Sequence, residues 1–211
     1  MKILATENEL KIVKQLTGAE DKRIEVSETG WTSRVYIIDG GKIVFKFPRN
    51  AKFRDECKQE VKVLKLIKEQ EFKINVPVLN WTTDDNKYFG YYGVEGEPLG
   101  EVIDSLNEKQ KIEIGTQLGK FLKQLHSIKN YGDIKSQTLE EQAEEYQNWY
   151  RKDRNLLKEF FSELELKTID DFFANDVPKS MTGTGELVFC HGDLDYASIN
   201  NFLKRIRSKI L

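Results

Sequence analysis

Residues 34–48 read Arg34-Val35-Tyr36-Ile37-Ile38-Asp39-Gly40-Gly41-Lys42-Ile43-Val44-Phe45-Lys46-Phe47-Pro48, two apolar-rich runs on either side of a glycine pair. Period-two alternation is typical of strands, and Asp-Gly-Gly-Lys between two such runs is a strong hairpin-turn signal. Pro48 has no N–H to donate to a strand ladder, so the second run stops there. The pattern therefore predicts a β-hairpin within an antiparallel sheet.

Further strands and a helix are predicted on both sides of this hairpin. Residues 23–26 form a strand pattern before it, and residues 76–79 and 88–93 form two more after it. Between them, residues 51–70 place apolar side chains at spacings of three and four, which indicates an amphipathic helix. We therefore expect a first lobe of five strands and at least one helix over residues 1–93.

An additional helix is predicted at the start of the chain. Thr6 is followed three residues later by Glu9, the spacing of a capping box that opens a helix. The helix is expected to run to about Leu16, where Gly18 supplies a C-terminal cap.

The second half of the chain is predicted to be mostly helical. Residues 93–98 are rich in glycine and proline and indicate a linker. A long helix is expected from Leu106 onward, then a helical block over residues 138–175 and a final strand over residues 186–190. These elements define a second lobe over residues 94–211.

Composition limits the classes of function. With 39% hydrophobic and 32% charged residues the chain is that of a globular protein, and no apolar run approaches the ~20 residues of a membrane span. No signal-peptide stretch is seen, so we expect a cytoplasmic protein in which Cys57 and Cys190 are structural thiols. The only dense basic run is the last few residues, which argues against a nucleic-acid partner. Residues 133–176 carry 12 acids and 6 bases, either a solvated helical face or a surface that attracts a cationic substrate.

Lys46 and Glu60 are the first candidates for chemistry. Lys46 lies inside an apolar strand, and Glu60 lies on the apolar side of the following helix. An unpaired charge is costly in either place, so we expect the two side chains to meet. A structural ion pair or a lysine reaching for solvent would explain the pattern. In the functional alternative, a third-strand lysine oriented by a helix glutamate holds nucleotide phosphates, as in kinases.

The loop ahead of this lysine is the second candidate. Residues 27–34, Ser-Glu-Thr-Gly-Trp-Thr-Ser-Arg, join the first two strands and contain one glycine. A loop of small residues can direct backbone N–H groups at a phosphate, although an ordinary hairpin turn would have a similar sequence. Its end at Ser33 lies 13 residues before Lys46 (46 minus 33), which favours the phosphate-binding alternative.

The third candidate follows the predicted terminal strand, in Leu187-Val188-Phe189-Cys190-His191-Gly192-Asp193. Asp193 is an acid that emerges from an apolar strand, the setting of a catalytic carboxylate in phosphoryl transfer. We expect His191 to be architectural and Asp195 to lie on the surface. No Asp or Glu follows Asp195, although transfer from a nucleotide needs Mg²⁺ held by hard oxygen ligands.

Together these segments resemble the aminoglycoside phosphotransferase family, relatives of choline kinases and distant relatives of protein kinases. The segments occur in family order and cover nearly the whole chain. The strand at 44–49 and the linker are most similar to the subgroup that acts on the 2''-hydroxyl of gentamicin-type drugs. The matching segments are 30–36, 44–49, 60–64, 93–99, 118–128 and 191–194.

The resemblance implies an α+β, two-lobed protein-kinase-like fold, with an antiparallel-sheet lobe and a mostly helical lobe. ATP or GTP would bind between the lobes, and the second partner would be a cationic small molecule. Asp193 would accept the proton of the substrate hydroxyl. The implied nucleotide-binding residues are Ser27, Gly30, Ser33, Lys46, Glu60, Tyr91, Gly93 and Val94.

The sequence departs from the family pattern after Asp193. The family places a metal-binding Asn five residues after the base, and this position is Ser198 here. Asn200 could take that role for Mg²⁺ only if the loop rearranged. The family's next strand, with its metal-binding Asp, is not found in the 18 residues that follow Asp193 (211 minus 193), so we expect an incomplete second lobe, truncated after the catalytic loop.

The sequence thus predicts a phosphotransferase that moves a nucleotide γ-phosphate to an aminoglycoside hydroxyl and confers antibiotic resistance. One alternative is a catalytically inactive remnant or pseudokinase that binds nucleotide. A weaker alternative is a small-molecule kinase of choline or sugar type.

Overall fold

The computed structural model describes residues 2–94, 96–134, 136–182 and 188–190. They form two compact units. The first comprises residues up to 134 together with 189 and 190, and the second comprises residues 136–182 with 188. Within these ranges, no helix combines the length and the apolar character that crossing a membrane requires.

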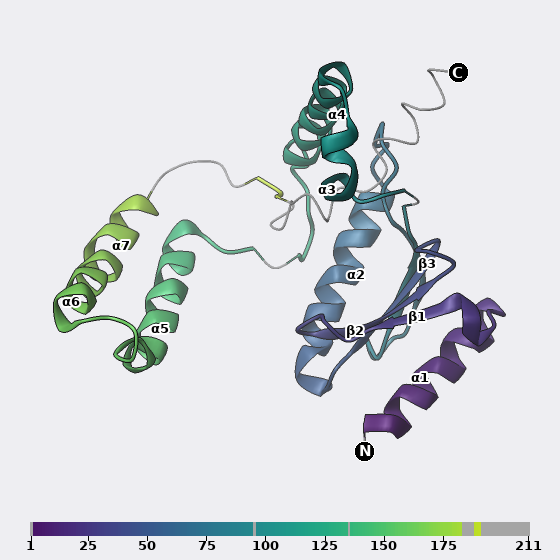
Figure 1. The fold of residues 1–211 in the computed structure, drawn as a ribbon, viewed down its shortest axis with the longest axis horizontal. Coiled ribbons are helices and arrows are strands. Elements are labelled where there is room, and N and C mark those ends of the chain that lie inside the picture. Colours follow the sequence, from purple (N-terminus) through teal and green to yellow (C-terminus); the bar gives the residue numbers. More distant parts are fainter. Residues whose placement is uncertain (1, 95, 135, 183–187, 191–211) are drawn as a thin grey trace. The chain divides into compact units, whose positions relative to one another are not determined.

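The first unit is built on a five-stranded antiparallel sheet with the order β1-β2-β3-β5-β4 (Figure 1). The predicted hairpin is confirmed, because Tyr36 pairs with Phe45 and the turn between the two strands has positive φ at Asp39, Gly40 and Gly41. The strands are β1 (Ile24–Ser27), β2 (Ser33–Ile38), β3 (Ile43–Pro48), β4 (Val78–Thr82) and β5 (Phe89–Tyr92).

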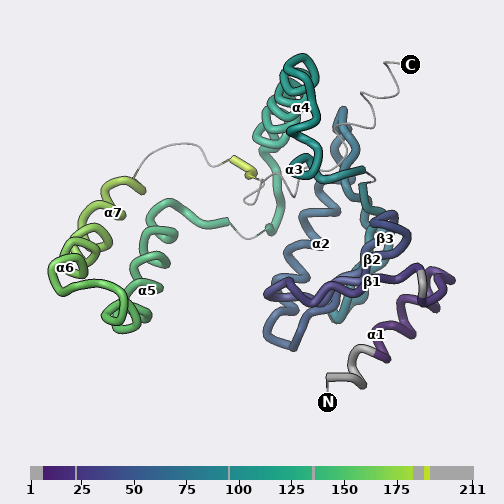
Figure 2. The backbone as a smooth tube through the Cα atoms, viewed as in Figure 1, coloured from purple at the N-terminus to yellow at the C-terminus, as the bar shows by residue number. Residues whose placement is uncertain are grey.

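Two helices cover the two faces of this sheet (Figures 1 and 2). On one face, Val13 of α1 (Lys2–Thr17) packs with Tyr36 and Phe45, both fully buried. On the other face, α2 (Arg54–Lys68) packs Cys57 and Val61 against β4 and β5. Successive residues of a strand point to opposite faces, so Phe45 faces α1 while its neighbour Lys46 faces α2.

Two predicted boundaries in this unit are wrong. α1 begins at Lys2, so Thr6 lies inside the helix and is not its N-cap. The predicted end is confirmed, since Gly18 has φ +67° and its N–H donates to the Lys14 carbonyl at 2.7 Å. β4 begins at Val78, two residues later than expected. Pro77, which precedes it, has no N–H for a ladder.

Beyond β5 the chain forms α3 (Leu99–Val102), the 3₁₀ turn η3 (Ile103–Ser105) and the long helix α4 (Glu108–His126). Helix α4 matches the helix predicted from Leu106 onward. It opens with a capping box in which Asn107 accepts from the Gln110 N–H at 3.0 Å and the Gln110 side chain accepts from the Asn107 N–H. Such a cap satisfies backbone donors that otherwise lack a partner.

α4 is attached to the connection between α2 and β4. The rings of Phe121 and Phe72 lie 5.4 Å apart, and Gln124 Nε2 donates to the Glu71 carbonyl at 2.8 Å. These two contacts join the α2–β4 connection to α4, the first long helix after the predicted linker.

The second unit consists of helices. They are α5 (Leu139–Leu157), α6 (Glu163–Asp171), the π-helical turn η4 (Phe172–Asp176) and α7 (Val177–Ser180). Asp170 joins α6 to α5. It accepts from Tyr150 Oη at 2.7 Å and from Nε and Nη2 of Arg154 at 2.5 Å each. The guanidinium and the phenol hold the pKa of the Asp170 carboxyl down at about 2.

The terminal strand predicted over residues 186–190 is not formed in the part of it that the structure describes. Val188, Phe189 and Cys190 have no regular secondary structure, and residues 186 and 187 lie outside the described ranges. Phe189 instead places its ring 6.4 Å from that of Tyr131. An apolar run of three to five residues is equally compatible with such a packed, extended segment.

Candidate nucleotide site

The predicted meeting of Lys46 and Glu60 is present in the structure. Lys46 Nζ donates to Glu60 Oε2 at 2.6 Å, from the centre of β3 to the middle of α2. The ammonium also lies 6.0 Å from the centre of the Phe89 ring. The side chains of Lys46 and Glu60 are 27% and 39% exposed, so this charged pair is accessible and not sealed in the core.

The surroundings keep Lys46 charged. Burial lowers the pKa of its ammonium, but the neighbouring groups, Glu60 first among them, raise that pKa by more, so it lies above the ordinary lysine value. Burial also raises the pKa of Tyr91, which keeps the phenol neutral beside the pair. The accessible group here is therefore a charged ammonium held by Glu60.

Cys57 and Ser33 complete this cluster. Cys57 is buried on α2, one turn before Glu60, and burial together with the Glu60 charge raises the pKa of its thiol to about 11. A hydrogen bond from Ser33 acts in the opposite direction. Ser33 is buried at the start of β2, so the predicted loop residue lies next to the predicted lysine pair.

The loop from 28 to 32 is held from one side by Arg49, the residue after β3. The Arg49 N–H donates to the Thr32 carbonyl at 2.9 Å, and Arg49 Nε donates to the Gly30 carbonyl at 2.7 Å. Arg49 Nη2 donates to the Glu28 carbonyl. Ser27 and Thr29 exchange a hydroxyl hydrogen bond at 2.9 Å, and Trp31 is 93% exposed at the loop's tip.

Gly93 and Val94, two of the implied nucleotide-binding residues, follow β5. The Gly93 N–H donates to the Lys42 carbonyl at 3.0 Å, and a Cβ at position 93 would lie 1.9 Å from the Gly41 carbonyl oxygen. Only glycine therefore allows β5 to end this close to the β2–β3 turn. Tyr91 faces the Lys46 side of the sheet, and Val94 is partly exposed.

The remaining predicted site residues lie outside the described residues. These are the candidate base Asp193 and the candidate metal positions Ser198 and Asn200. Among the residues that the structure does describe, no three His, Cys, Asp or Glu side chains are grouped as a metal site requires. The described part of the predicted site thus offers an accessible ammonium and, within those residues, no group of three such side chains.

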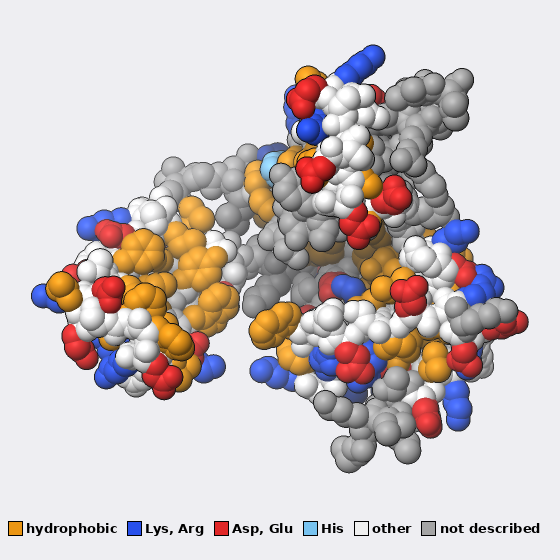
Figure 3. All heavy atoms as spheres, in the orientation of Figure 1, with side chains coloured by type: hydrophobic (Ala, Val, Ile, Leu, Met, Phe, Trp, Pro, Cys, Tyr) orange, Lys and Arg blue, Asp and Glu red, His pale blue; other side chains and the backbone are white. Residues whose placement is uncertain are grey.

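Two hollows in the described residues do not have Lys46 among their lining residues. One, of about 430 Å³, is formed by aromatic side chains of the second unit, where Tyr150 and Phe173 stack 4.2 Å apart. Stacking of these rings packs α5 against the π-helical turn η4. The second unit still shows apolar side chains on its surface (Figure 3), among them Phe160 at 76% and Leu164 at 77% exposure.

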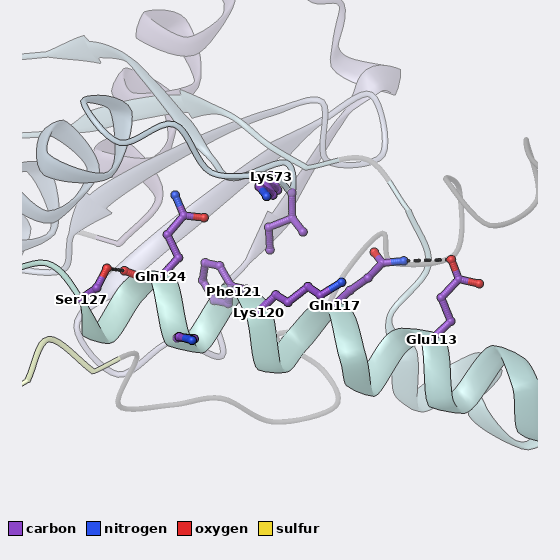
Figure 4. Close-up of a pocket in the computed structure, with 9 residues that line it drawn as sticks. Lys73, Glu113, Gln117, Lys120, Phe121, Gln124 and Ser127 are labelled. Atoms are coloured by element: carbon purple, nitrogen blue, oxygen red, sulfur yellow. Dashed lines mark hydrogen bonds between the residues drawn. The ribbon is translucent and has the colours of Figure 1, made fainter.

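The other hollow is a groove of about 730 Å³ between α4 and residues 73–74 (Figure 4). Gln117 and Glu113 lie along its α4 side, joined by a hydrogen bond of 3.4 Å, and Phe121 lies near its middle. None of the predicted site residues lines it.

Sequence reasoning missed Arg34, Arg49 and Glu9. Arg34 is buried at 7% exposure within β2, and its Nη1 donates to Glu9 Oε2 at 2.6 Å. Two signals in the sequence could have revealed them. A buried arginine in an apolar strand needs a partner, and an arginine directly after a strand-ending proline lies next to the neighbouring loop.

Comparison with known proteins places this geometry in a family. The model of the phosphotransferase enzyme family, APH, matches residues 23–195. No curated protein matches the chain in a sequence comparison.

Several solved structures share the fold. The GDP and kanamycin complex of APH(2")-IIia has a TM-score of 0.65 at 19% identity, over 93% of this chain and 68% of that one. The streptomycin–ATP–APH(2")-IIa ternary complex has a TM-score of 0.61 at 17% identity, over 79% and 56%. Macrolide 2'-phosphotransferase MphH from Brachybacterium faecium, as apoenzyme, has a TM-score of 0.57 at 18% identity, over 92% and 67%.

These likenesses confirm the expected α+β kinase-like fold. The chain spans 56% of the length of APH(2")-IIa and 58% of that of APH(2'')-Ib, which was solved with ADP. The five-stranded sheet with its Lys46–Glu60 pair lies within the residues that the family model covers. With that match over most of its length, the chain belongs to the phosphotransferase enzyme family.

Proposed function

We propose that the chain binds ATP or GTP and transfers the γ-phosphoryl group to a hydroxyl of a cationic small molecule. The observation that carries the proposal is the 2.6 Å pair between Lys46 and Glu60, which fixes an accessible ammonium on the α2 side of the sheet. A fixed cation of this kind neutralises phosphate charge without reorganising during the reaction.

In the proposed step, Lys46 holds the nucleotide phosphates and Glu60 orients Lys46. Asp193 accepts the proton of the substrate hydroxyl while the oxygen of that hydroxyl forms a bond to the γ-phosphorus. The bond between that phosphorus and the bridging oxygen breaks in line, and the nucleoside diphosphate leaves. Catalysis by these groups consists of positioning and electrostatic stabilisation.

Mg²⁺ would supply charge neutralisation at the transferring group in a complete site. Asn200, the candidate position for holding it, lies outside the described residues.

For the acceptor we propose an aminoglycoside. Support comes from the fold neighbours solved with kanamycin, gentamicin and streptomycin. It also comes from the excess of acids over residues 133–176, which would attract a molecule with several ammonium groups. Modification of such a drug would confer resistance to it, and the cytoplasm is where we expect it to occur.

A second candidate function is nucleotide binding without transfer. It is favoured by Ser198, which stands where the family resemblance places a metal-binding Asn. A serine hydroxyl is a weaker ligand for Mg²⁺ than the oxygens usually found in such sites. In this case the protein would act as a nucleotide-dependent platform and not as an enzyme.

The test has a binding arm and a transfer arm. ATP and GTP are titrated by calorimetry into the protein and into Lys46→Met, with Lys87→Met as the control, because Lys87 forms a similar 2.6 Å pair with Asp85 on an exposed hairpin. Transfer is followed by mass spectrometry of kanamycin, gentamicin, choline and a macrolide, with Mg²⁺ present.

We expect nucleotide binding that weakens about tenfold in Lys46→Met and is unchanged in Lys87→Met. We also expect phosphorylated kanamycin or gentamicin, with the rate reduced about 10²- to 10⁴-fold by Asp193→Asn. Binding without any product would favour the second candidate. Absence of binding to both nucleotides would overturn both.

A further inference from the structure

In the loop between β1 and β2, the backbone carbonyl groups and the backbone N–H groups differ in their hydrogen bonding. Three of its carbonyls, those of residues 28, 30 and 32, accept from Arg49. Within the described part of the chain, the backbone N–H groups of residues 28–32 donate to no acceptor. The loop therefore has its acceptors engaged and its donors available, which is what a phosphate-binding loop requires.

Arg49 suits this task by its shape. Its planar guanidinium presents several N–H donors in a fixed fork, so one side chain reaches two carbonyls while its backbone N–H reaches a third. Its Nη1 lies 3.7 Å from Glu28 Oε2, which adds a charge contact to the same loop. A lysine at this position would have a single flexible ammonium and could not reproduce the fork.

A second layer of contacts extends from the loop to the N-terminal helix. Glu28 accepts from Arg34 Nε at 3.4 Å, and Arg34 Nη1 donates to Glu9 Oε2 of α1 at 2.6 Å. The same Glu9 oxygen accepts from Tyr36 Oη at 2.8 Å. Because Arg34 is buried, its positive charge needs compensation, and the carboxylates of Glu28 and Glu9 provide it.

The backbone of the loop is restrained as well. A Cβ at Gly30 would lie 2.8 Å from the Ser33 carbonyl oxygen. The tight approach of residues 30 and 33 and the Arg49 fork thus fix the loop between the end of β1 and the start of β2.

From these contacts we propose that Arg49, together with the Glu9–Arg34 pair, positions the 28–32 loop so that its N–H groups face the nucleotide phosphates. Arg49 and Glu9 are positioning residues, since they act through the loop and not on the nucleotide. The inference rests on the proposed nucleotide-binding function, and it adds α1 to the elements that support the site.

The first test compares ATP with adenosine. Adenosine has no phosphates, so a variant that only misplaces the loop should lose affinity for ATP and keep its affinity for adenosine. We expect Arg49→Met to weaken ATP binding about tenfold and Arg49→Lys to weaken it nearly as much, with adenosine binding unchanged in both. General damage to the fold would weaken both ligands alike.

The matched control is Arg23→Lys. Arg23 forms a paired contact with Asp39 at the opposite end of the β1–β2 ladder, so its substitution changes an arginine–carboxylate pair far along the same strands. We expect ATP affinity to stay at the wild-type value in this variant. An equal loss in Arg23→Lys and Arg49→Lys would overturn the proposal.

The second test needs no nucleotide. Backbone ¹⁵N relaxation gives order parameters for residues 28–32 in the free protein and in the variants Glu9→Gln and Arg49→Met. Lower order parameters confined to the loop support the proposal, and unchanged values in both variants overturn it. If the wild-type protein binds no ATP, the proposed function fails, while this measurement still decides whether the two residues hold the loop.

Discussion

Lys46 illustrates how one residue combines packing with chemistry. Its stem lies on the α2 side of β3, beside Phe89, while its ammonium reaches Glu60 and remains partly exposed. Burial alone would favour loss of the charge, and Glu60 prevents that loss. The side chain therefore carries a full positive charge wherever the protein is folded near neutral pH.

This leads to a prediction about pH. The raised pKa of Lys46 keeps its ammonium charged at pH values up to and beyond the ordinary 10.5. Its contribution to stability is complete below pH 10.5, and this contribution and that to ATP binding are lost as the pH rises through the raised pKa. In Glu60→Gln, burial of Lys46 is no longer offset by the carboxylate, so the pKa falls and binding is lost at lower pH. The measurement is the ATP dissociation constant against pH in both proteins, and superimposable alkaline limbs would contradict the prediction.

At the scale of elements, the strands show what sequence can and cannot specify. The alternation in β2 and β3 and the turn at residues 39–41 were predicted because period-two patterning and glycine directly reflect backbone geometry. The start of α1 was not, because an apparent capping box at Thr6 is also compatible with a helix interior. Glu9, the other half of that pattern, is used instead by Arg34 across 25 residues, a contact that no local rule contains.

Packing across β5 gives a prediction at this scale. A Cβ at Gly90 would lie 2.6 Å from the Phe45 ring, which is fully buried. Gly90→Ala should therefore lower the free energy of unfolding by about 1–3 kcal/mol through overpacking. The double variant Gly90→Ala/Phe45→Leu should be less destabilised than the sum of the single changes, as measured by urea unfolding. Strict additivity would show that the ring is not the obstacle.

For the whole molecule, the described part of the proposed nucleotide site and most of the acidic residues of the range 133–176 fall in different units. The loop, Lys46 and Glu60 belong to the first unit, whereas most of the acid-rich range 133–176 belongs to the second. The family, the fold and this lysine–glutamate pair could all be predicted from the sequence, because they depend on short motifs. The lobe boundary after residue 93 and the roles of Asp193 and Asn200 stay predictions.

This separation can be tested by hydrogen exchange across the chain. ATP should slow exchange in residues 28–32 and in β3 while leaving α5 to α7 unchanged, and kanamycin should act mainly on α5 to α7. Lys46→Met is the control that should remove the effect of ATP and keep that of kanamycin. Protection by ATP concentrated in α5 to α7 would contradict the assignment.

The contact between Gly93 and the β2–β3 turn has an evolutionary consequence. Two stretches of main chain meet there with no space for a side chain between them. The residue type at position 93 and the length of that turn therefore cannot change independently during evolution. A homologue that carries a larger residue at the equivalent of Gly93 should also carry an insertion or deletion in the turn. Genome sequences alone can reveal whether the two changes occur together.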